Sequence, residues 1–584
     1  MNLLFATILA TLAMGGVEER PKVMLRDTMS DTWVATDALE RSLPGNKECG
    51  SPRADKFVGV FYFLWQHKQH DTGLFDNTKL IAADPANPKY GPRHAFHWWG
   101  EPFMGYYYMD DAFVIRKHAQ MLTDAGVDVI FFDVTNALTY DENLLAVCKV
   151  FTEIRKTGRT TPQIAFLANS NHIPTVQHLY DTFYAKGLYS DLWFRWKGKP
   201  ILLSPPEGLS PEVNAFFTLR HSWAWTDPNG WFKDGKDKWP WIDNHPQNPG
   251  WHTDRQKPEQ ISVSVAQHPI SYIGRSFHDG KEPAQPTPDV GICFEEQWKR
   301  ALAVDPELVF VTGWNEWIAM RFVNEGTEHV DSFLGKPIKE GGSYFVDQFD
   351  QEFSRDIEPM RGGHGDNYYY QFIANIRRYK GARPLPKASA PKSIKIAQSF
   401  RQWSDVKPLY LDDIGDTVHR NAPMWGGTGT YVNTTGRNDF DAMKVSRDDH
   451  NLYFYVKTVE PITVPAGENW MNLYLNTDGN HKTGWEGYDF AVRRAKIEGR
   501  DVLALCRNAG GWRWEVVQEV KYVVAGKEMQ FALPRQTLGL EPSRGHLRFE
   551  FKWADNVPDT GNILDFIDKG DVAPNGRFNY RFEE

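Results

Sequence analysis

Short apolar segments alternate with amphipathic segments along the first half of this 584-residue chain. Residues 57–65, Phe-Val-Gly-Val-Phe-Tyr-Phe-Leu-Trp, are typical of a buried strand. Residues 111–126 place apolar side chains at helical spacing between an Asp at the N-cap and a terminal Gly. Such alternation predicts a parallel sheet with right-handed helical crossovers. We expect further strands at residues 127–133, 163–169, 198–204, 261–265 and 308–312, and further helices around residues 144–154, 176–183 and 295–303.

The spacing of these segments favours an α/β fold, a (β/α)8 TIM barrel, over residues 50–380. In such barrels the functional groups lie at the C-terminal ends of the strands. An open doubly wound sheet is the alternative. However, the first strand is followed by Gln66-His67-Lys68, which is not a Gly-rich phosphate-binding loop.

The pattern changes beyond a Pro-, Ala- and Ser-rich linker at residues 381–394. Residues 451–457, 471–476 and 546–552 alternate apolar and polar side chains with period two, and turn residues such as Asp478-Gly479 lie between them. This pattern predicts an all-β sandwich domain over residues 395–584.

Composition and targeting signals narrow the class of protein. The net charge is −9 and no basic stripe is present, which argues against a nucleic-acid partner. Aromatic residues reach 14%, an enrichment expected either of sugar-binding surfaces or of large aromatic cores. The apolar run at residues 1–16 predicts a signal peptide, hence export to the periplasm or the extracellular space, and no later segment resembles a transmembrane helix.

The predicted strand at residues 308–312 leads directly into Gly313-Trp314-Asn315-Glu316-Trp317. A strand end that holds a carboxylate between two indoles suits a site that cleaves sugars. We therefore predict Glu316 as a catalytic carboxylate, Trp314 and Trp317 as apolar faces for a sugar ring, and Asn315 as a substrate-binding residue. The alternative is that Glu316 is a structural carboxylate or binds a sugar hydroxyl.

Glycoside cleavage generally needs a second acidic group, and the sequence offers several. Asp133 follows the second predicted strand, although a loop-capping role is the alternative. An acid-rich segment lies after Glu316, and its candidates are Glu325, Glu352 and Glu358, with Glu328, Asp347, Asp350 and Asp356 nearby. Other strand ends and one aromatic-rich loop supply the predicted substrate-binding residues Trp65, Gln66, His67, Glu101, Asn136 and Asn169.

Other reaction classes lack their usual motifs. The chain has no HExxH or paired-His spacing and no GxSxG elbow, so we expect catalysis without a metal or other cofactor and disfavour a serine hydrolase. In the predicted sandwich, Trp470 and Trp485 are candidate sugar platforms, with core packing as the alternative. A structural calcium ion near Asp478-Gly479-Asn480 is a further hypothesis.

The motif Trp314-Asn-Glu-Trp317, with the strand before it and Ile357-Glu-Pro359 after it, resembles the barrels of glycoside hydrolase families 71 and 99 over about residues 55–380. Family 99 enzymes act on α-mannosides. The resemblance implies that Glu316 acts as a base through the substrate's 2-hydroxyl. The family places its acid, a second Glu, three residues later, where this chain has Ala319. A long insertion also precedes Ile357. The acid must therefore come from elsewhere.

The tail resembles a family 9-like carbohydrate-binding module, through residues 439–445, 451–454, 476–479, 487–490 and 576–580. Together these features predict an exported glycoside hydrolase that acts on a polysaccharide or complex glycan through carboxylate acid–base chemistry. A non-catalytic glycan-binding protein is the main alternative. A transferase on the same barrel is a third alternative, disfavoured because it would need an activated sugar donor, which an exported protein rarely meets.

Overall fold

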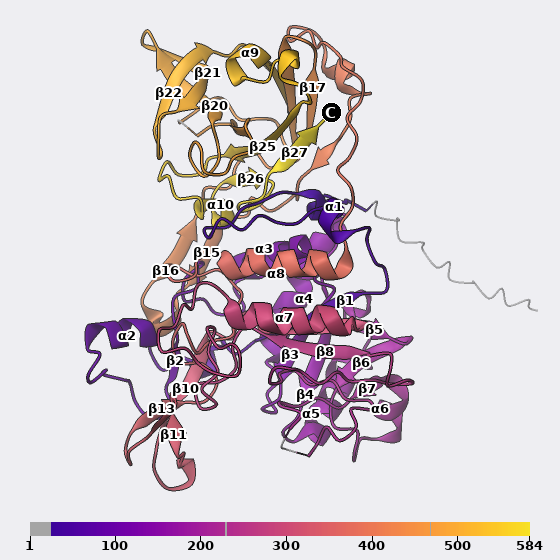
Figure 1. Ribbon diagram of the computed structural model, residues 1–584, viewed down its shortest axis with the longest axis vertical. Coiled ribbons are helices and arrows are strands. Elements are labelled where there is room, and N and C mark those ends of the chain that lie inside the picture. Colours follow the sequence, from indigo (N-terminus) through magenta and orange to yellow (C-terminus); the bar gives the residue numbers. More distant parts are fainter. Residues whose placement is uncertain (1–24, 228–229, 468) are drawn as a thin grey trace, which may run out of the picture.

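The structure is a computed structural model, and it describes residues 25–227, 230–467 and 469–584 (Figure 1). The predicted signal peptide at residues 1–16 lies outside the described residues. Within the described ranges, no helix combines the length and apolarity needed to cross a bilayer.

The first region is built on a mainly parallel sheet whose strands are almost wholly buried. Its spatial order is β7-β6-β4-β3-β1-β9-β8, and β5 (Arg195–Trp196) adds an antiparallel edge to β6. The predicted strands are all present. The parallel strands are β1 (Phe57–Tyr62), β3 (Val129–Val134), β4 (Gln163–Ala168), β6 (Lys199–Leu203), β7 (Thr218–Arg220), β8 (Gln260–Ser264) and β9 (Leu308–Thr312).

The predicted closed barrel is not observed, because no ladder joins β7 to β8 within the part of the chain that the structure describes. The segment between these strands makes only isolated bridges, such as His221 with Lys238 and Ala224 with Ile242. This segment is rich in Trp, Pro, Gly and Asp, a composition that suits turns better than a continuous strand. The result is an arc of seven parallel strands in the chain order of a barrel.

Helices cover the outside of this arc, and α7 and α8 lie side by side across it (Figure 1). Helix α3 begins after Asp111, whose side chain accepts a hydrogen bond from Phe113 N, and it ends at Gly126 in the left-handed conformation, as the sequence predicts. The main helices are α3 (Ala112–Ala125), α4 (Asp141–Lys156), α5 (His172–Leu179), α6 (Pro211–Phe216), α7 (Ile292–Val304) and α8 (Asn367–Lys380).

The insertion after Glu316 folds into a small antiparallel sheet that projects from the first region (Figure 1). Strand β10 (Ile318–Val323) pairs with β2 (Phe96–Trp98) on one side and with β13 (Ser343–Phe345) on the other. The chain then returns to the strand ends at residues 347–358, which brings a second set of polar side chains to Glu316.

The second region contains two antiparallel sheets whose aromatic side chains meet, for example Phe531 with Trp553 at a ring distance of 5.7 Å. The first sheet contains β14 (Tyr410–Leu411), β17 (Phe440–Arg447), β18 (Asn451–Thr458), β24 (Glu528–Pro534) and β23 (Tyr522–Ala525). The second contains β22 (Trp514–Glu519), β21 (Arg500–Asn508), β20 (Phe490–Ile497), β19 (Asn472–Asn476), β25 (Arg548–Asp555), β26 (Asp571–Ala573) and β27 (Tyr580–Glu583).

A hairpin of the second region reaches over the first. It consists of β15 (Arg420–Pro423) and β16 (Thr430–Asn433). Arg420 forms an ion pair with Asp111 at 2.7 Å, so the carboxylate that caps α3 also holds the hairpin. The Trp425 ring lies 5.6 Å from Trp98, and the Tyr431 hydroxyl accepts a hydrogen bond from Tyr106 N at 2.8 Å.

Candidate active site

Glu316 lies in the turn that follows β9, at the C-terminal edge of the parallel strands. Asn315 fixes this turn, because its side chain accepts a hydrogen bond from Phe63 N at 2.9 Å and donates one to Phe63 O at 3.0 Å. The backbone N–H of Glu316 donates to the Asp356 carboxylate. The neighbouring strand β1 and the returning segment therefore both position the Glu316 side chain.

The two oxygens of the Glu316 carboxylate have different surroundings. Oε2 accepts hydrogen bonds from Arg355 Nε at 2.9 Å, Arg355 Nη2 at 2.6 Å and Gln348 Nε2 at 2.7 Å. No donor to Oε1 is found among the described residues. Oε2 is thus held in place, and Oε1 is left to carry or exchange a proton.

Burial raises the pKa of Glu316 well above its usual range, because the side chain is only 2% exposed. The Arg355 guanidinium opposes this shift, whereas the carboxylates of Asp347 and Asp356 add to it. A carboxyl group of this kind can stay protonated at neutral pH and act as a general acid.

Asp347 lies at the open side of this pair. Its Oδ1 is 3.5 Å from Arg355 Nη2, and its side chain is 33% exposed. The charge of Asp347 also acts on Asp133, where it raises the pKa, and on His268, where it opposes the lowering caused by burial. Asp347 is therefore the acid that the structure brings near Glu316, Arg355, Asp133 and His268 together.

Asp133 is the penultimate residue of β3 and is buried. Its Oδ2 accepts a hydrogen bond from Trp65 Nε1 at 2.6 Å, and its Oδ1 accepts one from Thr135 N at 3.0 Å. Burial raises the pKa of Asp133 to about 6, although these hydrogen bonds oppose the shift.

Replacing Asp133 by Asn is expected to change the pH dependence of stability. The unfolded chain releases the Asp133 proton near pH 3.8, whereas the folded protein holds it up to a pKa of about 6. The stability that this group contributes is therefore full below the lower value and lost as the pH rises through the higher one. The measurement is thermal unfolding of both proteins. The difference in melting temperature, variant minus wild type, should rise between pH 4 and 7. A constant difference would contradict this assignment.

The other predicted acids lie elsewhere. Glu325 is half exposed on the projecting sheet, 3.3 Å from Arg93. Glu352 accepts hydrogen bonds from the backbone and the hydroxyl of Ser276, at 2.6 and 2.7 Å. Glu358 is fully buried and accepts hydrogen bonds from Tyr107 and Trp317, at 2.7 and 2.6 Å. The structure therefore does not present these three carboxylates to the open side of Glu316.

The indoles of Trp314 and Trp317 are both fully buried, so neither offers a face to a sugar. This corrects the expectation from the motif. Trp317 stacks on Trp99 at 4.5 Å, and Trp314 contacts the His118 ring at 5.6 Å. Their size and their enclosure by other aromatic rings make them part of the core that supports Glu316.

The remaining predicted binding residues divide between the core and the surface. Gln66 is buried and donates to Asn315 O at 2.7 Å. Asn136 is exposed, Asn169 is half-buried, and Glu101 forms an ion pair with Lys79 at 2.5 Å. His67 lines an open cavity of about 660 Å³ with Tyr140, whose pKa is raised by burial and by the charge of Asp133. That cavity therefore lies on the Asp133 side of the site.

Two indoles from the segment between β7 and β8 lie near Arg355 and His268. The Arg355 guanidinium lies 5.5 Å from the Trp241 ring. Trp225 donates a hydrogen bond to Gln267 at 2.8 Å, and its ring is 5.9 Å from His268. Both are partly exposed. The high density of Trp residues between positions 223 and 241 is the signal in the sequence that indicates them.

In the second region, Trp470 and Trp485 are both buried. Trp470 donates to Thr463 O at 3.0 Å, and Trp485 packs against Trp512 at 4.3 Å. Core packing therefore accounts for both, which corrects their predicted use as sugar platforms.

Comparison with known proteins gives similarities at low identity. No protein-family model matches the chain, and no curated protein matches it. Among solved structures it is similar to two of the family 99 endo-α-mannosidase from Bacteroides thetaiotaomicron, with TM-scores of 0.32 and 0.31 and identities of 12% and 14%. A third, a glycoside hydrolase-like protein, has a TM-score of 0.32 and an identity of 12%. The three similarities cover 55% or 56% of this chain and 95% to 98% of the other.

Proposed function

We propose that this protein is a glycoside hydrolase in which Glu316 acts as the general acid and base and Asp347 is its carboxylate partner. One observation supports the proposal above the others. A buried carboxyl group at a strand end has one oxygen fixed by three hydrogen bonds and the other free of donors, with a second, partly exposed carboxylate on the same arginine.

This arrangement suits cleavage of a glycosidic bond. The proton on Glu316 Oε1 would pass to the leaving oxygen as the bond from that oxygen to the anomeric carbon breaks. Asp347 would attack the anomeric carbon, or would take a proton from an attacking water. Arg355 and Gln348 would hold Glu316 in position throughout, since both donate to the oxygen that does not exchange the proton.

The spacing of the two carboxylates favours the retaining course. Glu316 Oε2 and Asp347 Oδ1 lie 2.6 and 3.5 Å from the same Arg355 nitrogen, so these two oxygens cannot be farther apart than the two distances together. Retaining glycosidases separate their carboxyl groups by about 5–5.5 Å, and inverting ones by about 6.5–9.5 Å.

Proposed sugar contacts are the rings of Trp225 and Trp241 and the cavity beside His67. The expected substrate is an oligosaccharide or polysaccharide that an exported enzyme would meet.

The alternative is a glycan-binding protein without turnover. The observation that favours it is the ion pair with Arg355, which covers one side of a carboxylate that is already 2% exposed. Such a protein would bind the same glycan and release no product.

Both the reaction and the role of Asp347 can be tested together. Wild type, Asp347→Asn and Glu325→Gln would be incubated with a panel of plant, algal and host glycans, and released reducing ends measured. Glu325 is the matched control because it is an exposed acid on the insertion that precedes Asp347. Acid–base groups contribute about 10²- to 10⁴-fold. We therefore expect Asp347→Asn to lose at least about 10²-fold of the rate, while Glu325→Gln keeps it.

Equal rates in all three proteins would remove Asp347 from the mechanism and direct attention to Asp133. Binding of a glycan by wild type, with no release of reducing ends from that same glycan, would instead establish the binding protein.

A further inference from the structure

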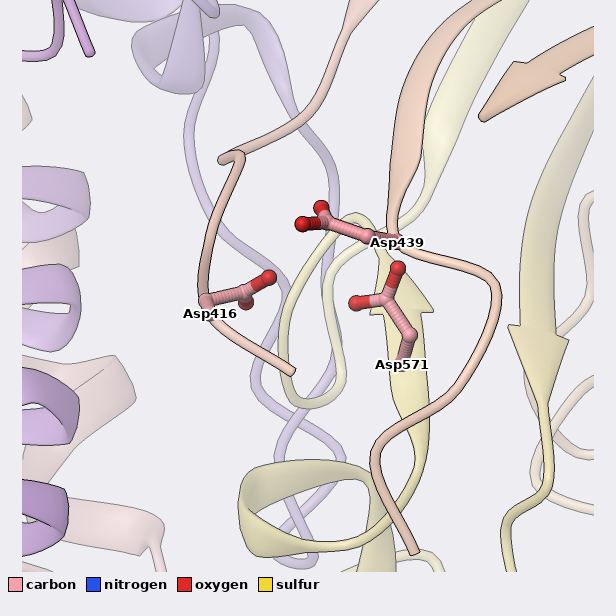
Figure 2. A group of neighbouring side chains, drawn as sticks. All are labelled: Asp416, Asp439 and Asp571. Atoms are coloured by element: carbon pink, nitrogen blue, oxygen red, sulfur yellow. The ribbon is translucent and has the colours of Figure 1, made fainter. Parts of the chain in front are cut away.

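Three aspartates of the second region meet beside α3, outside the candidate active site. Asp416 lies in the loop between β14 and β15, Asp439 directly precedes β17, and Asp571 begins β26. Each offers one carboxylate oxygen, and these three atoms lie within 4.8 Å of one another. Figure 2 shows the three carboxylates directed toward a common centre from three separate segments.

Two of these carboxylates keep a buried oxygen without any hydrogen-bond partner. Oδ1 of Asp416 and Oδ1 of Asp439 are both enclosed and unpartnered. The Asp416 side chain is only 4% exposed, so bulk solvent does not reach it. Their second oxygens are satisfied, Asp416 Oδ2 by Gln120 at 2.7 Å and Asp439 Oδ2 by Gly415 N at 2.8 Å. An unpaired buried carboxylate oxygen is costly and needs a positive partner.

The charges around the cluster do not balance. The carboxylate of Asp412 is also fully buried, and both its oxygens lack hydrogen-bond partners. The cationic groups that act on the cluster include Lys117, 3.9 Å from Asp416, Arg116, and Arg26, which contacts Asp441 at 2.8 Å, while buried Lys552 acts on Asp412. Among the described residues, Lys117 is thus the one cation within 4 Å of these three carboxylates.

We propose that Asp416, Asp439 and Asp571 bind a divalent cation of the calcium class. An all-carboxylate donor set suits a hard cation, and no His or Cys belongs to the group, which disfavours zinc. Calcium takes oxygen ligands at about 2.3–2.6 Å. Oxygens on one such ion are therefore separated by no more than about 5 Å, which the spacing within the cluster satisfies.

The ion would brace the contact between the two regions. Gln120 of α3 donates to Asp416 Oδ2 and, at 3.2 Å, to Asp413 Oδ2. Arg159, also of the first region, donates to Asp413 at 2.5 Å. A cation that fixes Asp416 therefore fixes the loop that carries these contacts.

The test uses the full-length protein, stripped with EDTA and then dialysed with or without calcium chloride. Bound calcium would be counted by atomic emission, and the melting temperature measured in both states. Wild type should retain one equivalent that Asp439→Asn lacks. At calcium about 100-fold above its Kd, the wild-type melting temperature should rise by about 5 °C or more. Asp449→Asn, an exposed neighbour in the same region, is the matched control and should behave as wild type.

The effect of Asp439→Asn on stability in EDTA distinguishes a cation site from a cluster that is merely strained. Without the ion, Asp439→Asn removes repulsion and should be as stable as wild type or more so, while with calcium it should be the less stable protein. A variant that is less stable by the same amount in both states would overturn the proposal. Calcium that binds wild type but is lost in Asp478→Asn would also overturn it, and would place the ion in the Asp478-Gly479-Asn480 turn instead.

Discussion

Replacing Glu316 by Gln is expected to lower kcat on the active glycan by about 10²- to 10⁴-fold, with folding and glycan binding retained. Gln has nearly the same shape and keeps an oxygen for Arg355, but it cannot deliver a proton to the leaving group. Arg355 is not left alone in this variant, because it also donates to Gln267 O at 2.9 Å and contacts Asp347. The measurements are steady-state kinetics, binding by calorimetry and the melting temperature.

Substrates with different leaving groups distinguish the possible roles of Glu316. An aryl glycoside with an acidic phenol needs little protonation, so loss of a general acid should reduce its cleavage far less than that of a natural glycan. Equal losses on both substrates would assign Glu316 a nucleophilic role. Full activity on both would exclude it from the chemistry.

Replacing Arg355 by Leu is expected to lower the free energy of unfolding by about 1–3 kcal/mol, since it takes two hydrogen-bond donors away from the buried Oε2 of Glu316. Both side chains are only 2% exposed, so solvent cannot compensate. In the double variant Arg355→Leu, Glu316→Gln the two losses should not add, because both substitutions act on the same hydrogen bonds.

Urea unfolding of wild type, both single variants and the double variant gives the coupling energy between the two side chains. Arg93→Leu is the control, because Arg93 also pairs with acidic groups but lies on the surface of the projecting sheet. It should leave the free energy of unfolding nearly unchanged. Additive effects at Arg355 and Glu316 would mean that the ion pair does not carry the stability assigned to it.

The strands and helices of the first region could be predicted because their patterns are local. The α3 helix has its apolar spacing, its Asp111 cap and its Gly126 stop within a single stretch. The strand before Glu316 likewise has a continuous apolar run. Barrel closure depends instead on whether β7 and β8 meet, and the Trp-rich segment between them makes isolated bridges rather than a ladder.

The partners of Glu316 could not be predicted, because they follow an insertion whose fold the sequence does not indicate. The sheet formed by β10 and β13 returns the chain so that Gln348 and Arg355 contact Glu316, whereas Glu358 enters the core. Asp347 and Glu358 thus have opposite environments although both belong to this returning segment, because Asp347 is 33% exposed and Glu358 is fully buried. The same holds for Trp314 and Trp317, whose burial depends on rings from distant segments.

The hairpin of β15 and β16 constrains how this architecture can evolve. Domains that are joined by a linker and share few contacts can be exchanged as independent units. Here recombination at residues 381–394 would leave the Asp111 carboxylate without Arg420 and would uncover the Trp98 indole that packs against Trp425. The two regions are therefore expected to be inherited as a pair, with changes in one matched by changes in the other along their shared surface.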